Sequence, residues 1–182
     1  MKGKIFTSGD IWSYMVWSDH RLIRILENIS DEDYDREFNE LSGNVRSKAA
    51  HIVSIYEFFL NTLEGKGPAQ FPDKSDLSRL ELVSLWKSYL LEMQDYITSS
   101  HGLVALPLAE NQRVDVNHVF LDAAIHTIHH RGQILTMLRL MGKSKSDIHP
   151  GDTNMDYLMY LFAEKNEEIH PTLQKEDHQY GK

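Results

Sequence analysis

The chain has 182 residues, of which 41% are hydrophobic and 25% charged, a composition typical of one folded domain with a sizeable core and not of a disordered chain. Its formal net charge of −8 speaks against a basic surface for DNA or RNA, so no nucleic acid is expected as a partner. Cysteine is absent, which excludes disulfides and thiolate ligands, so any metal ion would be held by nitrogen and oxygen atoms.

The first ten residues carry two lysines but no apolar run of the kind found in signal peptides. No later stretch is long and apolar enough to span a membrane, so we expect a cytoplasmic location and no membrane partner. A first helix is predicted to begin near Ser8 or Asp10 and to end near Ser30, because apolar residues recur there at helical spacing. Its first half is rich in aromatic residues, which serve either core packing or a dimer surface.

Two more long helices are predicted in the first hundred residues. Residues 30–33 fit the cap of a short helical turn, and a long helix follows over residues 44–63, with Gly65 as its stop signal. Residues 78–81 fit a capping box, and the helix that they begin continues to about Ser99.

A fourth long helix is predicted between the N-cap Asp115 and the stop signal Gly142, after a connection over residues 101–114 that is partly extended. A short fifth helix is expected over residues 155–165, capped by Thr153 or Asn154. Four long amphipathic helices and one short one predict an all-α four-helix bundle. We expect a single domain over residues 1–182, with its core at about 8–165 and a polar tail, which includes His170 and His178, over 167–182.

Residues 126–130 hold three of the ten histidines of the chain. His126 and His130 are four residues apart, so on a helix they lie one turn apart on the same face and can bind one metal ion together. At about 100° per residue, both are predicted to lie in the middle of a largely apolar, inward-facing stripe. Burying two unpartnered imidazoles there would be costly, and a metal ion would supply the partner. The alternative is that both are core histidines bonded to neighbouring polar groups. His51, on the predicted second helix, becomes relevant only if it meets them in space.

Several known site types do not fit this pattern. A helical metalloprotease needs a glutamate directly after the first histidine, where this chain has Thr127. Di-iron bundles need Glu-x-x-His pairs on two helices, and the four long helices predicted here contain none. Fingerprints for dinucleotides, for nucleotide phosphates and for a serine nucleophile elbow are also missing. A two-histidine site that requires a third ligand remains, and three nitrogen ligands with an open position are typical of catalytic zinc.

Residues 126–133, His-Thr-Ile-His-His-Arg-Gly-Gln, resemble the His-x-x-x-His-Arg-Gly-Gln signature of the DinB-like (DinB/YfiT) superfamily. The resemblance extends over most of the chain, through the Trp-rich first helix and the segments Ser42-Gly43-Asn44, Ala49-Ala50-His51-Ile52-Val53 and Met155-Asp156-Tyr157-Leu158. It implies an up-down-down-up four-helix bundle, often a homodimer. It also implies a divalent metal ion, zinc or nickel in many members, held by His51, His126 and His130.

The resemblance further implies that His129 is an extra histidine beside the site, and that Arg131 and Gln133 act in structure or around the ligands rather than in catalysis. Related branches resemble S-transferases and isomerases that use a low-molecular-weight thiol such as bacillithiol or mycothiol, and others resemble hydrolases. We therefore expect a metal-dependent enzyme that activates a water or such a thiol to attack a small electrophile. Asp122, the carboxylate nearest the histidines, is a candidate base or orienting residue. The alternatives are a non-catalytic, stress-associated protein in which the metal ion staples two helices, and a metal-free dimeric bundle.

Overall fold

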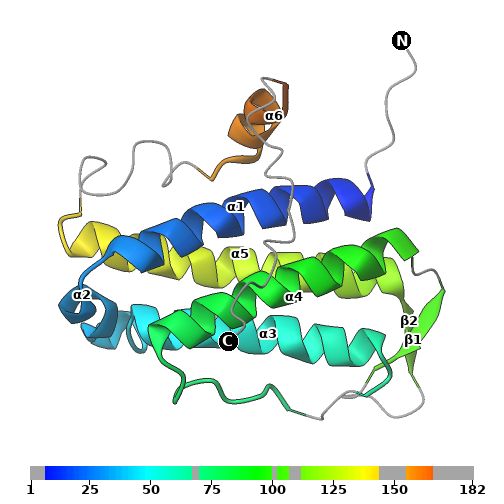
Figure 1. Cartoon of the computed structure of the whole chain (residues 1–182), viewed down its shortest axis with the longest axis horizontal. Helices are drawn as coiled ribbons and strands as arrows, with labels where there is room; N and C mark the ends of the chain where they lie inside the picture. The colour runs from blue at the N-terminus through cyan, green and yellow to red at the C-terminus, as the bar shows by residue number, and fades with distance from the viewer. Residues whose placement is uncertain (1–6, 67–69, 100–101, 107–111, 144–154, 166–182) are drawn as a thin grey trace, which may run out of the picture.

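Four long helices lie side by side in the computed structural model, which describes residues 7–66, 70–99, 102–106, 112–143 and 155–165 (Figure 1). They are α1 (Ser8–Asn28), α3 (Val45–Leu63), α4 (Arg79–Ser99) and α5 (Val116–Leu140). α1 and α5 run in one direction and α3 and α4 in the other, so the bundle has the expected up-down-down-up order (Figure 1). The predicted all-α four-helix bundle is confirmed.

The long helices begin close to their predicted starts, although α1 is capped by Thr7 and not by Ser8 or Asp10, the caps that the sequence favours. Thr7 caps α1 with Asp10, and Asn44 caps α3 with Ser47, each as a reciprocal capping box. Before α4, the Ser78 backbone N–H and hydroxyl both donate to the Glu81 carboxylate. These contacts satisfy backbone N–H groups that have no partner within a helix, so each helix start is fixed locally.

The short elements close the ends of the bundle. α2 (Asp31–Asp35) follows the N-cap Ser30, and a 3-10 turn, η1 (Asn39–Leu41), precedes α3. The expected extended piece between α4 and α5 is a two-stranded antiparallel sheet of β1 (Leu103–Ala105) and β2 (Arg113–Asp115). Asp115 then caps α5 by accepting a hydrogen bond from the Asn117 backbone N–H.

The short C-terminal helix, α6, spans Tyr157–Lys165, so the prediction that it starts at Met155 was wrong by two residues. Asp156 takes the capping role, because its carboxylate accepts a hydrogen bond from the Leu158 backbone N–H at 2.8 Å. The caps proposed from the sequence, at residues 153 and 154, and the polar tail, with both of its histidines, lie outside the described residues.

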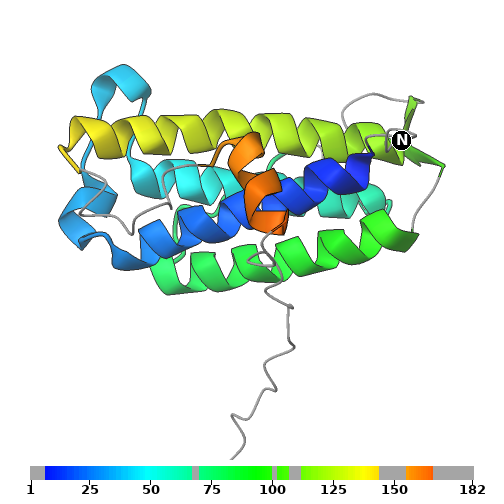
Figure 2. The same ribbon diagram turned by 90° about the horizontal axis from the view of Figure 1, so that it is seen from above.

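The aromatic half of α1 belongs to the core of the chain. The Trp12 side chain is 1% exposed and packs edge-on against rings from α3 and α5. Tyr14 and Trp17 contact Tyr160 of α6, which crosses α1 (orange in Figure 2). Core packing is therefore the reading that the structure supports for these rings, and they give no support to a dimer surface on α1.

A buried polar cluster ties the four long helices together. Asp19 of α1 is fully buried and accepts hydrogen bonds from the Tyr56 hydroxyl of α3 at 2.5 Å and from the Trp86 indole N–H of α4 at 3.0 Å. The Arg131 guanidinium of α5 lies 3.6 Å from its second oxygen. Burial raises the pKa of Asp19 to about 6, although Arg131 acts against this rise. No helix among the described residues is long and apolar enough to cross a membrane.

Candidate metal centre

The bundle brings together three histidines that are far apart in the sequence. His51 lies on the second turn of α3, and His126 and His130 lie one turn apart on α5, which packs against α3. One ring nitrogen from each histidine lies within 4.8 Å of the other two. The ring of His51 is 5.4 Å from that of His126 and 4.5 Å from that of His130, centroid to centroid. Three nitrogen donors at these separations can surround one metal ion.

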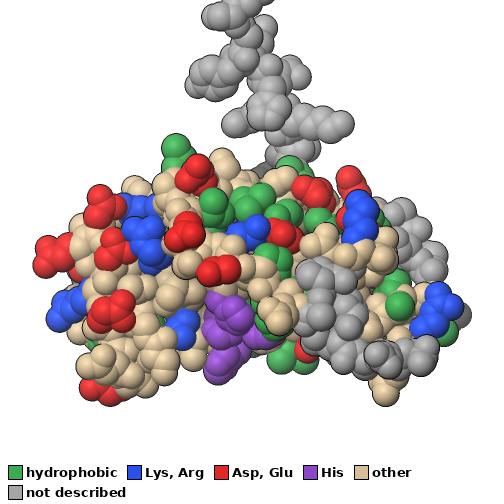
Figure 3. All heavy atoms as spheres, turned by 90° about the horizontal axis from the view of Figure 1, so that it is seen from below, with side chains coloured by type: hydrophobic (Ala, Val, Ile, Leu, Met, Phe, Trp, Pro, Cys, Tyr) green, Lys and Arg blue, Asp and Glu red, His purple; other side chains and the backbone are tan. Residues whose placement is uncertain are grey.

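The histidines lie at the edge of the buried face of α5. The prediction that His126 and His130 occupy the middle of an inward-facing stripe was wrong, because both side chains are only half-buried. The buried line of the helix runs instead through Ala123, Thr127 and Arg131. Histidine side chains accordingly form a patch at the surface on the side of α3 that faces downward in Figure 1 (Figure 3). An ion and a small molecule can reach this patch from solvent.

All three histidine rings are in the neutral protonation state that metal binding requires. Partial burial lowers the pKa of His51, of His126 and of His130, the last to about 4. Their mutual repulsion when charged adds to this effect for His51 and His130. At neutral pH the rings are therefore neutral and offer nitrogen lone pairs.

Gln133 orients one of these rings. Its side-chain oxygen lies 2.8 Å from Nδ1 of His130. When Nδ1 carries the proton, it donates to this oxygen and leaves the Nε2 lone pair free for a metal ion. This contact agrees with the role around the ligands that the family resemblance implies for Gln133.

Arg131, which also belongs to the signature run, makes its contacts away from the histidines. Its guanidinium is buried, donates to the Ser18 and Tyr14 hydroxyls of α1, and pairs with Asp19. Its contacts are those of a structural residue, as expected from the sequence.

His129 and Asp122 lie outside the group of converging nitrogens. The His129 ring is exposed and lies 4.9 Å from that of His130. Asp122 is exposed one turn before His126, and its charge works against the fall in the pKa of that histidine. Asp122 is thus close enough to act on His126 electrostatically, and its role in catalysis stays a prediction.

Phe71 is a site residue that the sequence did not indicate. It lies in the connection between α3 and α4, which was predicted only as a loop. Its ring meets those of His51 and His126 nearly edge-on, at 5.6 and 5.7 Å, and also packs on Phe58. Phe71 therefore covers one side of the histidine cluster with an apolar surface.

Beside His51 and Phe71 the surface is hollowed by a cavity of ≈ 350 Å³. It lies between α3 and the connecting segment over residues 70–75. The lining residues come from these two elements, and they are Ser47, Ala50, His51, Ser54, Phe71, Pro72, Asp73, Lys74 and Ser75. The cavity is thus continuous with the histidine cluster through two shared side chains.

The segment that carries Phe71 is fastened to α3 along its length. The Ser54 hydroxyl donates to the Pro72 carbonyl, and Lys74 forms an ion pair with Glu57, which also accepts a hydrogen bond from Tyr89 of α4.

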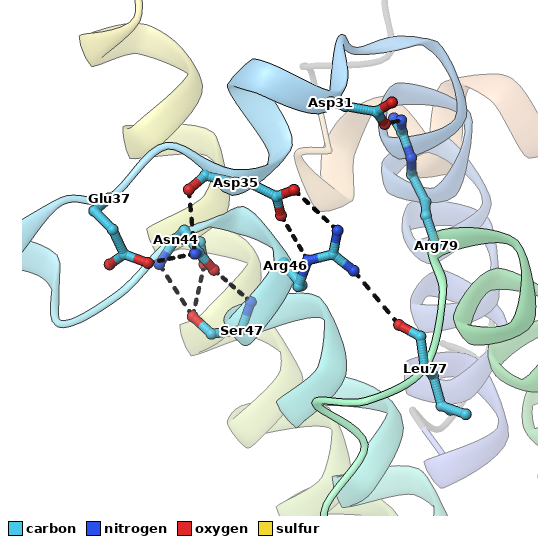
Figure 4. A network of polar contacts seen from close by, with 8 residues as sticks. All are labelled: Asp31, Asp35, Glu37, Asn44, Arg46, Ser47, Leu77 and Arg79. Carbon is cyan, nitrogen blue, oxygen red and sulfur yellow. Dashed lines mark hydrogen bonds and ion pairs between the residues drawn. The ribbon is translucent and has the colours of Figure 1, made fainter.

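Farther along the segment, Arg46 donates to the Leu77 carbonyl at 3.5 Å while its other nitrogens hold Asp35 (Figure 4). Where the segment ends, Arg79 at the start of α4 pairs with Asp31 at the start of α2 (Figure 4). The wall of the cavity is therefore fixed to the bundle before any ligand arrives.

A model of the DinB family matches residues 1–168, which include all the histidines of the cluster. No curated protein matches the chain.

Proposed function

The chain belongs to the DinB family, and from this premise we propose that it is a metal-dependent enzyme whose divalent ion is held by His51, His126 and His130. The ion would activate a water molecule or a low-molecular-weight thiol for attack on a small electrophile, as in an S-transferase or a hydrolase. The observation that carries the proposal is the convergence of three neutral imidazoles within 4.8 Å of one another at a solvent-accessible edge of the bundle.

The donor set fits a divalent transition metal ion. Neutral imidazoles suit zinc and nickel, the two ions that we propose, and the absence of cysteine leaves no thiolate ligand in the chain. Gln133 fixes the orientation of one ligand ring, which is a usual feature of histidine metal sites. A bound divalent ion would supply Lewis acidity, lowering the pKa of a water or thiol that reaches its open side.

The side chains around the cluster would exclude water and accept a proton. Phe71 excludes water from one side of the histidines, because its ring packs on two of them. We propose that Asp122, on the exposed side, accepts the proton that the nucleophile releases, or orients His126. An incoming thiol is compatible with a chain that has no thiol of its own.

Coordination favours catalysis over a purely structural ion. Among the described residues, no fourth histidine, aspartate or glutamate joins the converging group. Structural zinc sites are closed by four protein ligands, whereas catalytic sites keep a position open. The homodimer implied by the resemblance stays a prediction.

The proposal is tested by metal analysis of untagged protein purified without added metal. We expect close to one ion per chain in the unaltered protein, loss of the ion in His130→Ala, and retention in His118→Ala, which removes an exposed histidine of the same helix. Both variants should keep their helical circular dichroism. Screening with thiols and electrophiles should then give activity that follows metal content.

Activity that persists in metal-free protein would overturn the proposed function. A stoichiometric ion whose removal by a chelator melts the bundle would instead support the structural alternative.

A further inference from the structure

We propose that the cavity beside His51 is the pocket for the body of the substrate, and that it selects a small, largely apolar molecule without a negative charge at that end. This inference rests on the proposed function, because it assigns a substrate class to the same metal centre. It concerns the segment over residues 70–75, of which the catalytic proposal uses Phe71 alone.

The position of the cavity is the first argument. His51 contributes both to the converging nitrogens and to the lining, and Phe71 contacts the cluster while forming a wall. A molecule whose reacting atom lies at the metal centre can therefore place its remaining atoms in the adjoining cavity, beside the two shared side chains. Binding pockets next to catalytic groups usually have this continuity.

The lining determines the chemistry of the occupant. Ala50, Phe71 and Pro72 give apolar surface, which favours burial of a hydrocarbon or aromatic group. Ser47 and Ser75 add exposed hydroxyl groups at the rim, and that of Ser47 already donates to the Asn44 carbonyl. The third serine, Ser54, already donates its proton to the Pro72 carbonyl.

The charges of the lining disfavour an anion. Lys74, the one lysine or arginine among the described lining residues, is already neutralised by its ion pair with Glu57. Asp73 is exposed and keeps its negative charge, since a hydrogen bond from the Ser75 backbone N–H lowers the pKa of its carboxyl group. A carboxylate or phosphate at the end of the cavity away from the metal centre would therefore be repelled by Asp73, and Lys74 would not compensate, because it is already paired.

The size of the cavity limits the occupant as well. At roughly 30 Å³ for each water-sized atom, ≈ 350 Å³ corresponds to about a dozen non-hydrogen atoms. A single substituted aromatic ring fits this space. Because the wall is fastened to α3 through Pro72 and Lys74, the pocket is formed before the ligand binds, which lowers the entropic cost of binding.

The test uses protein loaded with Co²⁺, in which a bound thiolate gives a ligand-to-metal absorption band. Three thiols serve as probes: 2-mercaptoethanol, phenylmethanethiol and 4-(sulfanylmethyl)benzoate, the last carrying a carboxylate on the same ring. We expect phenylmethanethiol to bind about tenfold more tightly than 2-mercaptoethanol, since its ring enters the apolar cavity. The carboxylate probe should lose most of that advantage.

Two variants localise the effect. Ala50→Leu fills the cavity and should lower the affinity for phenylmethanethiol about tenfold while changing that for 2-mercaptoethanol less than twofold. Asp73→Asn removes the exposed charge but keeps an oxygen for the Ser75 N–H, so it cannot disturb the core. It should raise the affinity for the carboxylate probe severalfold and leave phenylmethanethiol unchanged.

The outcomes separate this inference from the proposed function. If Co²⁺ binds and all three thiols bind equally, or if neither variant changes the order of affinities, the pocket assignment is overturned while the metal centre stands. If Co²⁺ does not bind to the three histidines, the proposed function fails and the pocket assignment fails with it.

Discussion

Replacing Arg131 by methionine is expected to destabilise the protein, and to do so more strongly above pH 7 than at pH 5. Arg131 is only 3% exposed to solvent, and its guanidinium is the cation that faces the fully buried Asp19. Methionine has a similar length and fills the space, so the change removes mainly charge and hydrogen bonds. Removing one partner of a buried ion pair costs about 3–5 kcal/mol. For a chain of this size that corresponds to a fall in Tm of about 6–20 °C.

The pH dependence follows from the pKa of Asp19. In the folded protein this pKa is raised by burial to about 6, above the unfolded value of about 3.9. A raised carboxyl pKa contributes stability that is complete below about pH 4 and is lost as the pH rises through 6. The positive charge of Arg131 lowers the pKa of Asp19, so the variant has a still higher folded pKa. The variant therefore continues to lose stability above pH 6, by up to about 1.4 kcal/mol per pH unit, where the original protein has levelled off.

The assay is urea unfolding of both proteins at pH 5 and pH 8, in the presence of a chelator so that metal binding does not contribute. At pH 5 we expect a smaller difference of about 2 kcal/mol, from the lost hydrogen bonds to Ser18 and Tyr14. Arg139→Met, at an exposed position near the end of α5, is the matched control and should stay within about 0.5 kcal/mol. Equal losses at the two pH values would refute the buried-charge reasoning.

Three further predictions concern the helices that carry the histidines. Asn44→Ala removes the N-cap of α3 together with a 2.5 Å hydrogen bond to Glu37 (Figure 4), and it should cost about 1–2 kcal/mol, read as a lower urea midpoint at unchanged slope. Gln133→Leu removes the partner of His130 and should weaken metal binding by about 10- to 100-fold in competition with a coloured chelator, while stability without metal stays nearly the same. Because the pKa values of the three ligand histidines are lowered, protons compete only weakly with the metal ion for the ring nitrogens. Metal affinity should therefore be constant from pH 8 to about pH 6 and fall below that. A fall that begins near pH 7 would contradict the assignment of neutral rings.

Local signals in the sequence were sufficient for the helices. The caps at Asn44, Ser78 and Asp115 act within three residues, so their pattern is readable without any tertiary information. The pairing of His126 with His130 is equally local, because it depends only on helical geometry. Their meeting with His51 is a tertiary contact, and only the resemblance to a family indicated it.

Two features could not be predicted from the sequence, because they depend on packing between distant segments. Arg131 and Thr127 are polar residue types, so the sequence placed the buried face of α5 too close to the histidines. In the structure both are buried, and Asp19 supplies the negative charge that pairs with the buried guanidinium of Arg131. Phe71 lies in a stretch with Gly and Pro that reads as a loop, and its position over the histidines depends on the path that Ser54 and Lys74 impose. The spacing of hydrophobic residues along the sequence cannot reveal either of these contacts between distant segments.

The way the connecting segment is fastened has a consequence for how such proteins diversify. At Pro72 and Leu77 it is held by main-chain carbonyls that accept from Ser54 and Arg46 of α3. Every amino acid supplies that carbonyl, so these two anchors do not depend on which side chains the segment displays, and only the ion pair of Lys74 with Glu57 does. Replacements at Phe71, Asp73 or Ser75 can therefore alter what the molecule accepts at little cost in folding. A descendant could acquire a new substrate through a few changes in one short stretch, with the helices and their histidines left as they are.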